Sequence, residues 1–426
     1  MKRLYYIITL ISFLFFSCSR EDFKVFEVED VWGSETAQLD LLVSNFQKNK
    51  FWEVVVQDGH NKSAHYGFLN INEASSADFM TDFSPLYSNF SKTNFQLRAF
   101  NRSAIINFPK ESKFAKMSQD AVYIDTTFAL NKIVKDTLFF LGTLKKSTLK
   151  LIPSSNEKYN ALKQHKIKET KASMNKIFEM PRYFFRIHKG AQSFEISRDT
   201  ILKTINFYYE ENNKVITKFV QYYYDEDGLV FLDPVRINGT VFDKIKVKSV
   251  GTSSAEFQDN IRITNEAEPL VYDQIIARSF NNNVHGSGWG SRDGFSTRQQ
   301  TGIGDVYKIR DYLMVSIFPV FINEDNPPVI HGLFGFVLLN GGISPGIEFP
   351  LVEFTDEGLL TFTVYHMDSF YGPDIQIKKS KEFLRPMFYN EKGFYVLQRN
   401  NEMVLVDARD ALTWINLRPI YLSYDQ

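Results

Sequence analysis

Short stretches rich in aromatic and β-branched residues recur along most of the chain, about ten residues apart and separated by polar turns. The first two stretches, Phe51–Val56 and Ala64–Ile71, flank a turn signal at Asp58–Gly59. Further candidate strands in this part of the chain are 78–83, 94–99, 103–108, 121–128, 136–141 and 148–152. The spacing is typical of an antiparallel barrel or sandwich and does not decide between the two.

A helix is predicted over residues 35–48, because Ser34 can cap its start and the apolar positions follow the helical period. The apolar residues at i, i+3, i+4 and i+7 are Leu39, Leu42, Val43 and Phe46. One face of this helix should therefore be buried.

Residues 154–178 are rich in lysine and contain neither Gly nor Pro, so they predict one long helix or a helix broken near its middle. Met180–Pro181 ends it. The lysines suit either a docking face for acidic partners or a solvated helix that packs one stripe on the first domain. The second interpretation is favoured, because charge runs usually mark exposed faces.

The strand pattern resumes after the Lys-rich helix and lasts to the end of the chain. The candidate strands are 182–188, 193–197, 204–210, 214–224, 229–232, 241–247, 333–339, 359–365, 393–398 and 402–407. We therefore predict a mainly β protein with two antiparallel β domains, an N-terminal helix and a Lys-rich connecting helix. The predicted parts are a signal peptide (1–17), a tether (18–32), an N-terminal domain with its closing helix (33–180) and a C-terminal domain (181–426).

The first residues read as a lipoprotein leader. Lys2 and Arg3 precede an apolar run, Leu4–Phe16, that is shorter than the ~20 residues of a transmembrane helix. Cys18, the one cysteine of the chain, follows directly after Ser17. This predicts lipid attachment at Cys18 and anchoring to the outer membrane; the alternative is a short apolar anchor that stays attached. The acidic pair in Ser19–Phe23 resembles the surface-export signal of Bacteroidota lipoproteins, which implies exposure at the cell surface.

Composition excludes several functions. Lys and Arg number 49 against 50 Asp and Glu, so no excess of positive charge is available for nucleic acid. A single cysteine excludes intramolecular disulfides and thiolate-rich metal centres. The 40 Phe and 21 Tyr suit β-sheet cores or, alternatively, an aromatic sugar-binding surface; core packing is favoured.

Three short motifs invite a catalytic or metal interpretation, and each has a simpler one. Gly342–Gly346 matches G-x-S-x-G, but no helix is predicted after it, so a hairpin turn is favoured. His60, His65 and Asp58 could hold zinc, although nothing supplies a further ligand. Asp225–Gly228 resembles part of a calcium loop, but Asp-Gly is itself a turn signal. We therefore predict no catalytic residue, no metal and no cofactor.

A glycine-rich polar segment, residues 281–305, is the candidate binding region. Long loops on β scaffolds often bind ligands. Trp289 with His285, Arg292 and Asp293 would stack on a sugar ring or hold a peptide carboxylate. The alternative is a surface insertion with Trp289 packed into the core.

Several segments of the sequence resemble those of one protein family. They are the strand Trp52–Val56, the return strand Tyr66–Leu69, the segment Leu149–Pro153 before the Lys-rich helix, and Gly228–Gly239. Together they are similar to a Bacteroidota family of outer-membrane lipoproteins known only as a domain of unknown function. The resemblance covers roughly residues 30–250 and is most specific at Gly228–Gly239, although members more often carry Glu where Asp233 stands.

Members of that family are typically encoded beside SusC/SusD-like nutrient-import systems, and the family has no established catalytic residues. The resemblance implies a non-catalytic binding or accessory module of such a complex. Its expected partners are the membrane, through the N-terminal lipid, a SusC/SusD-like transporter, and a glycan or peptide ligand. The alternatives are a structural subunit of another outer-membrane assembly, or a hydrolase acting on glycan or peptide.

Overall fold

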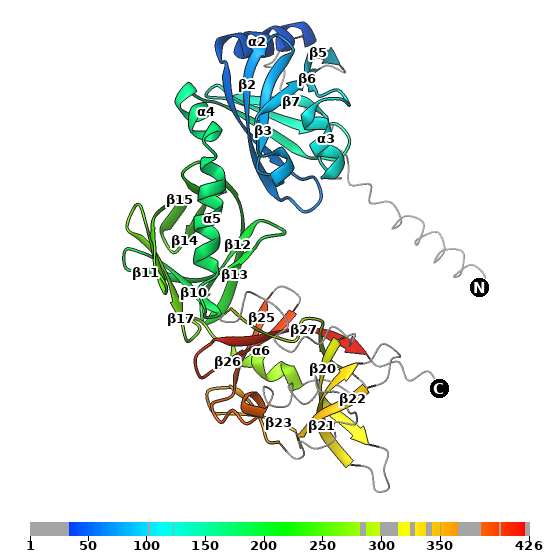
Figure 1. Ribbon diagram of the computed structural model, residues 1–426, viewed down its shortest axis with the longest axis vertical. Coiled ribbons are helices and arrows are strands. Elements are labelled where there is room, and N and C mark those ends of the chain that lie inside the picture. The colour runs from blue at the N-terminus through cyan, green and yellow to red at the C-terminus, as the bar shows by residue number, and fades with distance from the viewer. Residues whose placement is uncertain are drawn as a thin grey trace, which may run out of the picture. The chain divides into compact units, whose positions relative to one another are not determined.

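The computed structural model describes residues 34–100, 103–121, 123–281, 287–298, 314–323, 329–337, 343–349, 351–364, 385–399 and 402–421. The chain is mainly β and its sheets are antiparallel, as predicted. It divides into two compact units, Met1–Lys163 and Gln164–Gln426 (Figure 1). Among the described residues, no helix combines the length and the apolar character needed to cross a bilayer.

The first unit is built on a nine-stranded sheet. Its strands are β1 (Phe51–Gln57), β2 (Ala64–Glu73), β3 (Ser76–Thr81), β4 (Ser91–Asn94), β5 (Gln96–Phe100), β6 (Ser103–Asn107), β7 (Thr127–Val134), β8 (Thr137–Gly142) and β9 (Thr148–Pro153). Their order across the sheet is β4-β3-β2-β1-β9-β8-β7-β6-β5. The helices are α2 (Glu35–Lys48), η2 (Pro85–Tyr87), α3 (Lys113–Asp120) and α4 (Asn156–Lys163).

The predicted first helix is confirmed as α2. The Ser34 hydroxyl accepts a hydrogen bond from the Ala37 N–H at 3.3 Å, which caps the first turn. Leu42 and Phe46 are buried on the face turned to the sheet, and the Phe46 ring stacks on Trp52 at 5.4 Å. Burial of each such side chain contributes about 1.5–3 kcal/mol to folding.

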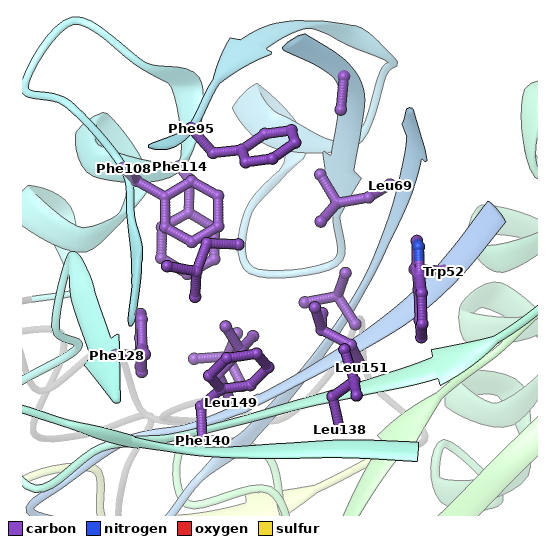
Figure 2. Close-up of a cluster of buried hydrophobic side chains, with 14 of the residues drawn as sticks. Trp52, Leu69, Phe95, Phe108, Phe114, Phe128, Leu138, Phe140, Leu149 and Leu151 are labelled. Atoms are coloured by element: carbon purple, nitrogen blue, oxygen red, sulfur yellow. The ribbon is translucent and has the colours of Figure 1, made fainter. Parts of the chain in front are cut away.

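Figure 2 shows the core of this unit, in which apolar side chains from strands and helix α3 converge. The rings of Phe108 and Phe114 stack at 4.0 Å, and Phe128 meets both edge-on. Trp52 is fully buried, and its indole N–H donates to the Asn49 carbonyl at 3.0 Å. These aromatic residues therefore serve the core, as favoured from the sequence.

The Lys-rich segment forms two helices, α4 and α5 (Lys166–Phe178). They are separated at His165, whose φ of 61° is left-handed and interrupts the helix. Tyr159 of α4 packs on Phe51 and Phe68 of the first unit. The buried stripe of α5, in contrast, packs on barrel strands of the second unit, whereas the sequence predicted packing on the first domain and a boundary after residue 180.

The second unit contains two sheets where one C-terminal domain was predicted. The first is a closed barrel of β10 (Phe184–Lys189), β11 (Gln192–Asp199), β12 (Thr204–Glu211), β13 (Lys214–Tyr224), β14 (Gly228–Ile237), β15 (Thr240–Val250), β16 (Ser254–Phe257) and β17 (Ile261–Glu266). Helix α5 contacts β13, β14 and β15 (Figure 1). Aromatic rings fill the interior; Phe207, for example, lies 5.5 Å from Phe242 and 5.9 Å from Phe231.

The second sheet has ten strands: β18 (Ser287–Ser291), β19 (Phe295–Thr297), β20 (Met314–Asn323), β21 (Val329–Val337), β22 (Ile343–Phe349), β23 (Val352–Phe354), β24 (Leu360–Phe362), β25 (Phe394–Arg399), β26 (Glu402–Asp407) and β27 (Thr413–Tyr421). Their order is β22-β21-β20-β18-β27-β26-β25-β24-β23, with β19 beside β27. Helices α6 (Gln274–Arg278) and η3 (Ser279–Asn281) connect the barrel to this sheet.

Candidate functional site

Trp289 of the predicted binding segment lies in β18 and packs inward. Its indole stacks on Phe280 at 5.5 Å with an interplanar angle of 10°, and its Nε1–H donates to the Phe280 carbonyl at 3.1 Å. Arg292 and Asp293 are exposed. His285 lies outside the described residues. Trp289 is thus partly buried and packs against the hydrophobic core of the C-terminal sheet, and its role in binding stays a prediction.

Packing restricts the glycines that flank Trp289, most strictly Gly288. A Cβ on Gly288 would lie 2.5 Å from the Phe318 ring and 2.8 Å from the Ile317 carbonyl oxygen, so the neighbouring strand could not approach as it does with a larger residue. A Cβ on Gly290 would lie 2.8 Å from the Ile420 side chain, which would have to shift. The pattern that suggested a glycine-rich binding loop is thus, in its described part, the pattern of a crowded strand.

The residues considered for zinc do not converge. The Asp58 carboxylate accepts hydrogen bonds from the backbone N–H groups of His60 and Asn61, at 2.7 and 3.0 Å, and so caps the turn. His60 is exposed and stacks on Tyr123 at 4.7 Å, whereas His65 is buried. Within the described ranges, no three His, Cys, Asp or Glu side chains are grouped to hold a metal ion.

Ser63, His65 and Asp82 have the connectivity of a hydrolytic triad. The Ser63 Oγ lies 3.3 Å from the His65 Nε2, and the His65 Nδ1 lies 3.9 Å from an Asp82 oxygen. That same oxygen accepts the Tyr66 N–H at 2.9 Å. Ser63 is only 4% exposed, so a substrate carbonyl cannot approach its hydroxyl. These contacts join β2 to the segment after β3 and provide no accessible nucleophile.

The acidic segment 225–228 forms a tight turn, as favoured from the sequence. An Asp225 carboxylate oxygen accepts the N–H groups of Asp227 and Gly228, each at 2.9 Å. Lys244 pairs with Asp225, and Lys246 pairs with Asp227 at 3.0 Å. Burial opposes ionisation of Asp227, but the two lysines outweigh it and hold the pKa of Asp227 below its ordinary value. These carboxylates are thus neutralised by neighbouring side chains.

The G-x-S-x-G serine, Ser344, lies in β22, which pairs antiparallel with β21. The next described element is strand β23, not the helix that a nucleophile turn requires.

A cleft of about 270 Å³ lies between the barrel and the C-terminal sheet, within the second unit. Three segments line it: Val215, Thr217 and Phe219 of β13; Val271, Asp273 and Ile276 at the start of α6; and Val396, Leu397, Gln398 and Arg399 of β25. On β13, the even-numbered residues Val220, Tyr222 and Tyr224 point into the barrel. Because side chains alternate along a strand, the odd-numbered residues of β13 face outward, and three of them form this part of the lining. The cleft could not be predicted from the sequence, because the segments that line it lie far apart along the chain.

One large apolar side chain of the lining is exposed to solvent. Phe219 lines the cleft and is 57% exposed. A large apolar side chain left in water loses the stabilisation that burial brings, and exposed apolar surface in a hollow is typical of binding sites. The combination of a hollow and an exposed aromatic ring makes this cleft the candidate functional site.

A buried ion pair joins the barrel to strand β25. Arg399 pairs with Glu195 of β11, and the exposed fractions of their side chains are 12% and 3%. Burial raises the pKa of the Glu195 carboxyl, while the Arg399 guanidinium and the backbone N–H of Leu270 counteract this by stabilising the anion. The rings of Phe184, of β10, and Tyr395, of β25, meet edge-on at 5.6 Å. The barrel and β25 are therefore fixed to each other by both polar and apolar contacts.

The edge of β25 that faces away from β26 is paired over only part of its length. β25 pairs with β26 at six positions but with β24 at a single position, Leu360 opposite Phe394. The Val396 N–H donates instead to the Tyr272 hydroxyl at 3.2 Å, and that hydroxyl donates to the Gly358 carbonyl at 2.8 Å. Burial raises the pKa of Tyr272 to about 12, so the phenol keeps its proton at neutral pH.

Comparison with known proteins gives a family without a function. A family model described as "Domain of unknown function (DUF4302)" matches residues 92–249. This range contains the phrase Gly228–Gly239 and the β13 wall of the cleft, but not the α6 and β25 walls. No curated protein is significantly similar to the chain.

Among solved structures, the chain is similar to the DNA polymerase III β chain of Streptococcus pneumoniae TIGR4, at 10% identity. The match covers 90% of this chain and 98% of that chain, with a TM-score of 0.12. A superposition of this quality does not establish a shared fold.

Proposed function

We propose that the protein is a lipid-anchored, non-catalytic binding module of the outer membrane, exposed at the cell surface and accessory to a nutrient-import complex. The leader with Cys18 supports the anchoring, and the acidic pair behind it supports surface exposure. The resemblance to lipoproteins encoded beside SusC/SusD-like systems supports the link to import. The observation that supports a binding role for this chain is the cleft with Phe219 exposed in its wall.

Association with a transporter is tested by co-purification from the native host. A tag is placed after Gln426, the outer membrane is solubilised gently, and the proteins recovered with the chain are identified. A SusC/SusD-like transporter is expected among them. A different stable assembly would instead favour a structural subunit, and recovery of the chain alone would contradict the accessory role.

The binding role of the cleft is tested by ligand-induced thermal stabilisation. The mature chain is heated with a peptide mixture and, separately, with soluble glycans, and one class is expected to raise the melting temperature. Phe219→Ser should abolish the rise. Phe100→Ser is the matched control, because Phe100 is similarly exposed, at 52%, but lies in the first unit. An equal response of both variants would refute the cleft as the site, and turnover of either class would favour the hydrolase.

A further inference from the structure

We propose that the ligand of the cleft is an extended peptide, bound as an additional strand along the free edge of β25. This inference rests on the proposed binding role of the cleft and names the chemical class that it takes. It does not depend on the association with a transporter.

The hydrogen-bonding groups of β25 point alternately to its two sides. In an antiparallel pair, every second residue directs its N–H and C=O away from the partner strand. Phe394 pairs on this side with Leu360, and Val396 donates on this side to the Tyr272 hydroxyl. Gln398 is the next residue of the same parity. Its backbone groups therefore face the cleft, and no partner for them occurs among the described residues.

An open strand edge of this kind is a template for β-augmentation, in which main-chain hydrogen bonds hold an extended peptide. Gln398 is exposed and lines the cleft, and its N–H and C=O point away from β26 by this alternation. Val396, on the same side, is buried, and its N–H is taken by the Tyr272 hydroxyl. A peptide strand laid here would therefore pair with Gln398, which offers one acceptor and one donor.

The opposite wall supplies the side-chain pocket. Val215, Thr217 and Phe219 alternate along β13, so they present a row to the cleft with the two-residue spacing of a strand. Every second side chain of a bound peptide would point toward this row. An apolar side chain there would cover the exposed ring of Phe219.

The charges of the cleft favour a neutral ligand. The Asp273 carboxylate accepts the N–H groups of Ile275 and Ile276, at 2.9 and 3.2 Å, as the cap of α6. The Arg399 guanidinium pairs with Glu195 and stacks on Tyr208. Both charged groups of the lining are thus matched within the protein, and the other lining residues are neutral. A peptide backbone with apolar side chains complements this surface better than an anion, a cation or a hydroxyl-rich sugar.

The volume limits how much of the peptide is enclosed. At about 270 Å³ the cleft is slightly smaller than the ~300–1,000 Å³ of typical ligand pockets. It therefore encloses a short stretch of the strand, and the remainder would lie outside the hollow.

The experiment begins with random peptides displayed on phage and selected on the mature chain. One selected peptide is synthesised with a fluorescent label, and its affinity is measured by anisotropy. Versions are then made with single backbone N-methyl groups along the sequence. Methylation should weaken binding about tenfold or more where the peptide N–H faces β25, and have little effect at the intervening positions, since each lost hydrogen bond leaves a carbonyl unpaired. Strand addition would be overturned if N-methylation weakened binding equally at the positions that face β25 and at those between them, or at neither set. A selection that yields no binder would also overturn it.

Two variants at one position test the protein side. Gln398→Pro removes the N–H that faces the cleft and keeps the bonds to β26, because proline is tolerated on an edge strand whose N–H is unpaired. Gln398→Ala removes the side chain but keeps that N–H. Proline should weaken the peptide about tenfold and alanine should not. Equal affinities would overturn the assignment of the edge.

The two proposals fail in distinguishable ways. If a peptide binds and Phe219→Ser abolishes binding but N-methylation shows no parity, the cleft is the site and strand addition is wrong. If Phe219→Ser has no effect on binding, the cleft itself is not the site. Because the N-methyl series leaves the protein unchanged, the result does not depend on the folding of Gln398→Pro.

Discussion

The guanidinium carbon of Arg399 lies 3.7 Å from the centre of the Tyr208 ring. Arg399 ends strand β25 of the C-terminal sheet, and Tyr208 belongs to barrel strand β12. The guanidinium also pairs with Glu195 on the neighbouring strand β11, which places it between an aromatic face and a carboxylate. Planar Arg suits this double role, which Lys could not fill. One side chain thus joins the two sheets that form the cleft.

Arg399→Ala should destabilise the second unit by about 3–5 kcal/mol, because Glu195 would be left buried without its cation. The measurement is urea unfolding of the mature chain, followed by a probe in the second unit. The double variant Glu195→Gln with Arg399→Met should recover much of the loss, since it leaves no unpaired charge.

Arg418→Ala is the control for this prediction. Arg418 pairs with Glu402 at 2.6 Å, but its side chain is 76% exposed, so the change should cost at most about 1 kcal/mol. Similar losses in Arg399→Ala and Arg418→Ala would show that the buried pair does not hold the two sheets together.

The sequence predicted the features that depend on neighbours along the chain. Helix α2 follows from the cap at Ser34 and a 3.6-residue period, and the turn at Asp225–Gly228 follows from Asx chemistry. Both are local, so residue types and spacing suffice. Whether the Lys-rich segment forms one helix or two could not be decided from the sequence, because the left-handed backbone conformation of His165 has no compositional signal.

What the sequence could not predict depends on contacts between distant segments. Glu195 and Arg399 are 204 positions apart, and nothing in either local sequence indicates their pairing. The predicted strand 121–128 begins only at Thr127, because the buried Asp125 instead accepts hydrogen bonds from Leu144, Lys145 and Ser147. A tertiary contact there overrides local β propensity.

Trp289→Ala should destabilise the second unit by about 1–3 kcal/mol, because it removes a partly buried ring stacked on Phe280 and its hydrogen bond to the Phe280 carbonyl. Arg292→Ala and Asp293→Ala should change the free energy of unfolding by less than about 0.5 kcal/mol, since both side chains are exposed. Urea unfolding measures all three. A weakened ligand affinity in Arg292→Ala, with unchanged stability, would support the binding role predicted for this segment from the sequence.

Because of Lys113, the free energy of unfolding of the first unit should change with pH in the alkaline range. Its ammonium donates to the carbonyls of Phe79 and Asn89, and burial lowers its pKa to about 8 from 10.5. Between these values the unfolded chain binds more protons than the folded chain, so the free energy of unfolding rises with pH. Because the residue is only half-buried, the rise should be about 1 kcal/mol.

The check is the difference in unfolding free energy between the wild type and Lys113→Met, measured from about pH 8 to pH 10. That difference should shift in favour of the wild type as the pH increases. Tyr87 acts in the opposite sense above pH 10, because burial and Asp120 raise its pKa to about 12. A pH-independent difference would mean that Lys113 titrates alike in both states.

Cys18→Ala should release the chain from the membrane. Without the thiol no lipid can be attached. The measurement is the distribution of the chain between membrane and soluble fractions of the native host, with Ser19→Ala as the control that leaves the thiol in place. A variant that remains in the membrane fraction and resists extraction would point to the alternative considered from the sequence, in which Leu4–Phe16 stays attached as the anchor. Mass spectrometry of the wild-type N-terminal peptide separates the two kinds of anchor, because lipidation with cleavage of the leader adds acyl mass at Cys18 and leaves no residues 1–17, whereas a retained anchor leaves Met1 through Ser17 on the chain.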